Sequence, residues 1–220
     1  MLTLLAVPLT LLSMQQPGAI AQRLAGRVSP NVAALVEQLG TTGSARGLPV
    51  DPLIQKAIEG SAKGIPDDRV AAAVRMVATQ LDAAAAALRE GGLASDTLAV
   101  AAGAFAITAG LSANDITALA RVGARPQALT VGLRVAGTLA ALGVPPAENI
   151  ALVSVSLRSG KSAADLLLLP ADVESEVAKG LTPAAAAAGL SRAAAAQARH
   201  GPPPGHGQQR PHPPAPPHHP

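Results

Sequence analysis

Residues 47–75 read GLPVDPLIQKAIEGSAKGIPDDRVAAAVR and contain one short motif twice. In order, the positions of the motif hold glycine; an apolar residue; proline or a small residue; any residue; Asp or Asn; any residue; and an aliphatic residue. It begins at Gly47 and Gly64, and it returns at Gly92 (GLASDTL) and Gly110 (GLSANDI). A left-handed glycine ends a helix, while proline and a short polar side chain suit the first turn of the next. The motif therefore predicts junctions between helices.

The spacing of the motif predicts a tandem repeat of helical hairpins. The first two copies lie 17 residues apart, the next two 18, and two looser copies at Gly143 and Gly160 again 17. The pairs begin at residues 47, 92 and 143, so successive starts are 45 and 51 residues apart. These periods lie in the range of known helical repeats. The alternative is an irregular alanine-rich helical bundle, in which the motif marks helix boundaries only.

The run GLPVDPLIQKAIEGSAKGIPDDRV resembles an uncharacterised family of secreted bacterial proteins that share the succession GLP, PL, KA, EG, AKG, P and R. The resemblance covers residues 47–81. No activity is attached to that family, so the resemblance implies export and assigns no catalytic residue.

The composition favours an all-α protein. Phe105 is the one aromatic residue, and the 220-residue chain contains no Trp, Tyr or Cys. Alanine, which is abundant, has the highest helix propensity, so local preference and fold class agree. The absence of cysteine excludes disulfides, thiolate metal sites and cysteine nucleophiles. A net charge of +3 without a Lys or Arg cluster, and without aromatic residues for base stacking, argues against nucleic-acid binding.

The chain divides into five predicted parts. A signal peptide is followed by a short helix with a linker, a helical-hairpin repeat domain, an alanine-rich helix, and a disordered low-complexity tail rich in proline and histidine. Their boundaries are residues 1–21, 22–46, 47–180, 181–200 and 201–220.

The N-terminus predicts export to the periplasm or the medium of a bacterium. Leu2–Leu12 is mainly apolar, and Ala19-Ile20-Ala21 supplies the small residues of a signal-peptidase site. The 11-residue apolar run is too short to cross a bilayer. The alternative is a disordered segment or a buried N-terminal helix.

Within the predicted helical region we expect several individual elements. A helix beginning at Ser29-Pro30 should end at Gly40, and Thr41–Arg46 should be a flexible linker. A narrow apolar seam follows from Pro66, formed by Val70, Val74, Val77, Leu81 and Leu88.

Later elements are expected as follows. The uncharged run Leu98–Leu111 favours a central helix buried on all sides over a membrane span, because Ala, Gly and Thr are too weakly hydrophobic. Arg125-Pro126 should interrupt the helix there, so that Gln127–Leu142 forms either a separate helix or a kinked continuation. Ala147–Leu157 should be a helix, with a strand as the alternative. After Pro170 a modest helix over Ala171–Lys179 should bury Val173 and Val177.

Three groups of charged residues are candidate sites. Lys56, Glu59 and Lys63 share one helix stripe, where a solvent-exposed ladder of ion pairs is the favoured interpretation. Asp67 and Asp68 are paired carboxylates, which stabilisation of a first helical turn explains. Arg134 lies alone in an apolar helix, where extension of its charged end to solvent is favoured over anion binding.

All five histidines lie at the C-terminus, and the predicted hairpin region has none. They are His200, His206, His212, His218 and His219. Imidazoles on such a tail could bind Zn²⁺ or Cu²⁺ weakly. The favoured interpretation is a solubilising tail, so we assign no catalytic, cofactor-binding or metal-ligating residue.

Together these observations predict an exported, non-enzymatic binding or structural module of the bacterial cell envelope, with a protein or another envelope component as partner. The chain is expected neither to bind nucleic acid nor to span a membrane, and no cofactor is implied. The alternatives are a hydrolase with Glu59, Asp67 or Asp68 and Lys63 around one concave pocket, and a metal-binding tail. The oligomeric state cannot be read from the sequence.

We predict cleavage after Ala21. Mass spectrometry of the protein from its native cells should give a mature chain that begins at Gln22. An intact Met1 in a soluble cytoplasmic pool would contradict the prediction.

Overall fold

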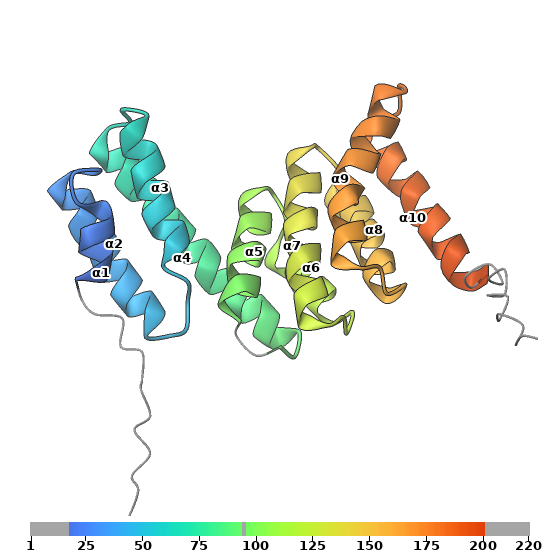
Figure 1. The fold of residues 1–220 in the computed structure, drawn as a ribbon, viewed down its shortest axis with the longest axis horizontal. Coiled ribbons are helices and arrows are strands. Elements are labelled where there is room, and N and C mark those ends of the chain that lie inside the picture. Colours follow the sequence, from blue (N-terminus) through green and yellow to red (C-terminus); the bar gives the residue numbers. More distant parts are fainter. Residues whose placement is uncertain (1–17, 94–95, 201–220) are drawn as a thin grey trace, which may run out of the picture.

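The computed structural model describes residues 18–93 and 96–200. Within these ranges the regular secondary structure is helical, joined by short connections, and there is no strand. The expected all-α class is confirmed (Figure 1). The helices are α1 Ala19–Leu24, α2 Pro30–Ser44, α3 Asp51–Ala62, α4 Asp67–Glu90, α5 Thr97–Thr108, α6 Ala113–Ala120, α7 Pro126–Ala141, α8 Pro146–Arg158, α9 Ala163–Ala178 and α10 Pro183–His200.

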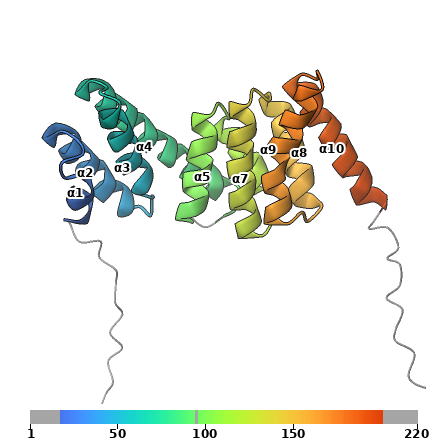
Figure 2. The same cartoon turned by 45° about the horizontal axis from the view of Figure 1, so that its top comes forward.

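The helices form stacked antiparallel hairpins in two layers. In one layer α5 packs against α7 and α7 against α9, and in the other α4 contacts α6, α6 contacts α8 and α8 contacts α10. The hairpin of α1 and α2 packs in the same manner on α3 and α4. Figures 1 and 2 show the resulting elongated row, with α1 and α10 at opposite ends. This is the helical-hairpin arrangement, a short α-solenoid.

Every connection between successive described helices contains one glycine with a positive φ. These are Gly26, Gly47, Gly64, Gly92, Gly110, Gly123, Gly143, Gly160 and Gly180. At Gly92, with φ +87°, the N–H donates to Arg89 O at 2.9 Å, and the next N–H, of Leu93, donates to Leu88 O at 3.0 Å. Two backbone carbonyls at the end of α4 are satisfied by this pair of bonds. The predicted left-handed junctions are confirmed: Gly64, Gly92 and Gly110 each lie two residues beyond the preceding helix, and Gly47 lies three beyond α2.

The predicted start of the third hairpin, at residue 143, is wrong. Hairpins begin after Gly47, Gly92, Gly123 and Gly160, so their starts are 45, 31 and 37 residues apart. The predicted interval of 51 residues between the second and third hairpins does not include a start at Gly123. The junction there (GARPQAL) has no acidic residue and therefore does not match the motif. The intervals of 45, 31 and 37 residues show that the hairpins are of unequal length.

The acidic residues of the motif do not occupy equivalent positions. Asp96 is the N-cap of α5 and accepts a hydrogen bond from Leu98 N–H at 3.0 Å. Asp68 is the second residue of α4 and makes no capping bond, so it complements only the helix dipole. At α6 the cap is Ser112, whose hydroxyl and backbone N–H pair with Asp115 in a capping box.

The expected end of α2 at Gly40 is wrong, because that helix continues to Ser44 through most of the predicted linker. A Cβ on Gly40 would lie 2.9 Å from both Ile20 Cδ1 and Val50 Cγ1. This glycine therefore allows close packing inside the helix and does not terminate it. Residues 1–17 of the predicted signal peptide lie outside the described residues, and its cleavage site at Ala21 falls within α1.

The expectation that Leu98–Leu111 is buried on all sides is wrong. α5 buries Ala99, Val100, Ala102, Gly103, Ala104 and Ala106. Its larger side chains Leu98 and Phe105 remain 66% and 46% exposed. The helix therefore packs through its small residues and presents large ones to solvent.

The C-terminal elements differ partly from expectation. α9 continues across Pro170, and it buries Val173 as expected, while Val177 is exposed. Ala147–Leu157 lies in helix α8, as predicted, and α7 is separate from α6, which is the first of the two expected alternatives. The alanine-rich segment forms α10, which packs on α8 and α9 with Ala186 and Ala187 buried. Tail residues 201–220 lie outside the described residues.

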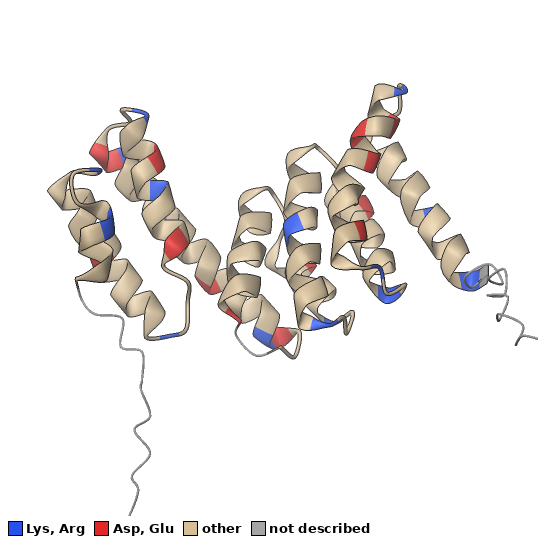
Figure 3. Ribbon diagram, viewed as in Figure 1, with Lys and Arg blue, Asp and Glu red and all other residues tan. Residues whose placement is uncertain are grey.

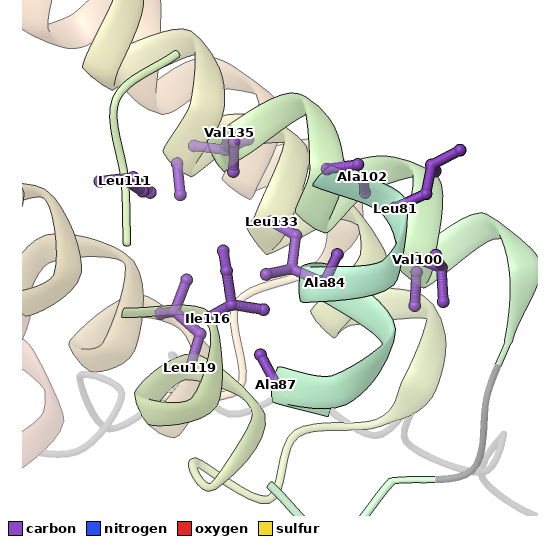
Figure 4. Packing of buried hydrophobic residues seen from close by; sticks show 14 of the residues in the cluster. Leu81, Ala84, Ala87, Val100, Ala102, Leu111, Ile116, Leu119, Leu133 and Val135 are labelled. Carbon is purple, nitrogen blue, oxygen red and sulfur yellow. The ribbon is translucent and has the colours of Figure 1, made fainter. Parts of the chain in front are cut away.

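Alanines are interspersed with larger aliphatic side chains in the core between α4, α5, α6 and α7 (Figure 4). Ala84 and Ala87 of α4 and Ala102 of α5 are buried together with Leu81, Ile116 and Leu133. A Cβ on Gly91 would lie 2.3 Å from the Cβ of Ala120 in α6. The helices are thus close enough for dispersion contacts despite the shortage of large residues.

The predicted seam of α4 is confirmed at Val70, Val74, Leu81 and Leu88, which are at most 1% exposed, while Val77 is half-buried. Among the described helices, α4 alone has the length and hydropathy of a membrane span. It contacts α2, α3, α5 and α6, as a core helix does, and so gives little support for a transmembrane protein.

Replacing either of the adjacent glycines Gly91 and Gly92 by alanine should lower the stability of the fold, each for a different reason. Gly92→Ala should cost about 1 kcal/mol from the left-handed backbone alone, because no atom lies within 4 Å of the added Cβ. Gly91→Ala should cost about 1–3 kcal/mol by overpacking against Ala120.

Ala120→Gly separates the two causes when unfolding by denaturant is followed by circular dichroism. It should offset part of the Gly91→Ala cost and none of the Gly92→Ala cost. Equal coupling of Ala120→Gly to both substitutions would contradict the close contact.

Candidate functional site

A groove of about 940 Å³ crosses the face formed by α3, α5, α7 and α9. α3 contributes Pro52, Gln55, Lys56 and Glu59, and α9 contributes Leu167, Pro170, Ala171 and Glu174 at the other end. Between them lie residues of α4, α5 and α7, which form the base: Val77, Gln80, Ala101, Ala102, Ala104, Phe105, Thr108, Arg134, Val135 and Thr138. We call this surface the groove.

The groove exists because α4 is twice as long as its neighbours. It has 24 residues against 12 each in α3 and α5. α3 packs near the start of α4, where a Cβ on Gly60 would lie 2.8 Å from Val70 Cγ2, and α5 packs near the end, where Gly103 faces Ala84. In the described part of the chain α3 and α5 are not packed together, and Val77 and Gln80 of α4 line the space between them.

Phe105 projects from α5 into the groove and rests on α7. A Cβ on Gly137 would lie 2.5 Å from Phe105 Cδ1 and 3.1 Å from Ala106 Cα. Only glycine allows the ring and the two backbones to approach this closely. The ring nevertheless stays 46% exposed, and Leu167 on the α9 wall is 58% exposed. Large apolar groups thus face solvent at two places in one concavity.

Polar side chains are interspersed with this apolar surface. The Thr108 hydroxyl donates to Gln80 Oε1 at 2.8 Å and joins α5 to α4. The Thr138 hydroxyl donates to the Arg134 carbonyl one turn earlier, at 3.1 Å. The groove therefore offers hydrogen-bonding groups beside apolar contacts, as ligand sites do.

The expected ladder on α3 is present. Lys56 Nζ lies 3.0 Å from Glu59 Oε2, and Lys63 Nζ pairs with Glu59 Oε1. Hydrogen bonds from Lys63 and then Lys56 lower the pKa of Glu59 from 4.5 to about 2. The Glu59 carboxylate therefore stays ionised in the physiological range.

Arg134 and Glu174 are the other charged residues of the groove. Both are exposed, and neither has an ion-pair partner among the described residues. Arg134 is the one charged residue on α7, and α5 has none, as Figure 3 shows. The base of the groove therefore carries a single positive charge within an uncharged surface.

The structure brings together only some of the predicted site residues. Lys56, Glu59 and Arg134 line the groove, whereas Lys63, Asp67 and Asp68 do not. Asp67 and Asp68 are exposed in the first turn of α4, consistent with the favoured dipole interpretation. The four residues proposed for a hydrolase are thus not gathered around this concavity.

The histidine candidates remain outside the site. His200 is the last residue of α10, and His206, His212, His218 and His219 lie outside the described residues. Within the described ranges no three His, Cys, Asp or Glu residues are grouped in a way that could hold a metal ion.

Sequence reasoning did not identify Phe105, Leu167 or Thr138 as site residues. The single aromatic in the uncharged α5 segment was the available signal, but an apolar helix gives no indication of which side is exposed. Comparisons with protein-family models, curated proteins and solved structures found no match for this chain.

The Glu59 ladder should give an acid-dependent contribution to stability. Because its pKa is lowered on folding, the contribution is complete above about pH 4.5 and is lost as the pH falls through about 2. NMR titration of the Glu59 carboxyl group checks the value. Lys63→Gln should raise this pKa towards 4.5, and an unchanged titration would show that Lys63 does not cause the shift.

Proposed function

We propose that this protein is an exported, non-enzymatic binding module of the bacterial cell envelope, and that the groove holds its partner. The observation that carries the proposal is Phe105. The one aromatic side chain of the sequence lies 46% exposed in a concavity of about 940 Å³. Aromatic side chains contribute strongly to interfaces, and solenoids use their concave surfaces for binding.

The charges of the groove favour binding over catalysis. A general acid or base that works near neutral pH needs a carboxyl pKa well above its ordinary value. The pKa of Glu59 is shifted in the opposite direction by its two lysine partners. The other residues of the alternative hydrolase site lie outside the groove, which supports the binding module over that alternative.

Export is the second part of the proposal and rests on the sequence. The apolar run Leu2–Leu12 and the Ala19-Ile20-Ala21 site support a cleaved leader. Cleavage after Ala21 would remove Ile20 and retain Leu24, the one fully buried side chain of α1. The mature chain would therefore lose the packing of Ile20 near Gly40 and keep the contact of Leu24 with the core.

Photo-crosslinking in the native cells tests the proposal. A photoreactive amino acid replaces Thr138, which is exposed in the groove, or Ala118, which is exposed on α6 and lies outside the groove. We expect an adduct of defined mass from position 138 in the envelope fraction, and none from position 118. No adduct from position 138, or equal adducts from both positions, would contradict binding in the groove.

A further inference from the structure

We propose that the groove binds a short peptide segment of a partner protein, one that combines apolar side chains with a carboxylate placed over Arg134. This inference rests on the proposed function and names the chemistry of the partner. It follows from the arrangement of charge, apolar surface and hydrogen-bonding groups in the groove.

The charge of the ligand follows from Arg134. Lys56, the other cation of the groove, is already paired with Glu59 at 3.0 Å. Arg134 has no acidic residue on its own helix or on α5, and no described residue forms an ion pair with it. A carboxylate that enters the groove would meet this guanidinium next to an apolar surface, where charge-assisted hydrogen bonds are strong.

The apolar part of the ligand follows from the surface beside Arg134. Phe105 lies in the base and is 46% exposed, and Leu167 on the α9 wall is 58% exposed, with Pro170 beside it in the lining. Burying such side chains contributes about 25 cal/mol per Å² of apolar area removed from water. The ligand therefore needs apolar groups on the same face as its carboxylate.

A peptide fits the groove better than an acyl chain with an acidic head group. Gln55, Gln80, Thr108 and Thr138 are distributed among the apolar lining residues. Thr108 is bonded to Gln80 and Thr138 to the Arg134 carbonyl, but the two hydroxyl oxygens and the two glutamine amides have capacity for further hydrogen bonds. Peptide N–H and C=O groups can use this capacity, whereas a hydrocarbon chain would cover it without forming a bond. The groove also spans α3 to α9, so it accommodates an elongated ligand.

The other end of the groove sets a second preference. Glu174 on the α9 wall is exposed and has no ion-pair partner among the described residues. A basic residue in the bound segment would complement this carboxylate. The expected segment is therefore apolar and acidic over α7, with any basic residue directed towards α9.

Selection from a displayed random peptide library tests the inference with the full chain. We expect the selected peptides to contain apolar residues together with Asp or Glu. Binding of these peptides should be about 10- to 100-fold weaker to Arg134→Glu, the range expected for loss of a hydrogen bond to a charged group. The same library selected on Arg134→Glu should yield Lys or Arg in place of the acid.

Matched controls make the result decisive. Arg158→Glu makes the same charge change at an exposed residue of α8 outside the groove and should leave peptide binding unchanged. Circular dichroism melts of both variants establish that they fold. Peptides that bind Arg134→Glu as tightly as the natural chain would overturn the inference. So would recovery of no peptide by a chain that binds the twelve-carbon fatty acid laurate in the groove.

Failure of this inference and failure of the proposed function are distinguishable. If position 138 still gives its adduct but peptide binding does not depend on Arg134, the groove is a binding site with a different ligand chemistry. If position 138 gives no adduct in the cells, the proposed function itself is wrong.

Discussion

The close approach of helix faces made of alanine and glycine is the constraint on which the rest of the structure depends. At Gly91 and Gly137 even a methyl group would meet a neighbouring helix at 2.3–2.5 Å. Interfaces this tight gain dispersion contacts from many small atoms and leave little space for a large side chain. Phe105 therefore lies over Gly137 at the edge of the α5–α7 interface, with nearly half of its surface exposed. The packing that stabilises the solenoid also places its one aromatic ring in the groove.

The length of α4 is the second determinant of the site. A repeat made of helices of equal length would stack α3 directly on α5 and close the space between them. Because α4 is about twice as long as either partner, α3 and α5 pack on different parts of it, and Val77 and Gln80 remain accessible between them. The unequal spacing of the hairpins is thus linked to the groove itself.

Features that depend on adjacent residues could be predicted from the sequence, whereas features that depend on contacts between distant helices could not. The glycine junctions were predictable because a positive φ and the first turn of a helix depend on adjacent residues. The motif does not cover the Gly123 junction, because that junction lacks the acid. A proline favours a helix boundary locally, but α9 continues across Pro170, where it packs against α7 and α10. The exposed side of α5 was not predictable, since TLAVAAGAFAIT is apolar all round and carries no periodicity. The groove joins residues from five helices, so no single segment indicated it.

Rigidity connects this packing to binding. The elements that hold Phe105 and Arg134 are α5 and α7, which meet through contacts with almost no free space. Neither helix can move far without separating from its neighbour, so the proposed ligand would meet a groove that the packing has already formed. A preorganised site loses less conformational entropy on binding than a flexible loop would. Arg134 retains a long flexible side chain on this rigid base, which allows one cation to reach carboxylates at somewhat different positions. In the proposed binding role, the apolar base would supply the fixed contacts and Arg134 the adjustable one.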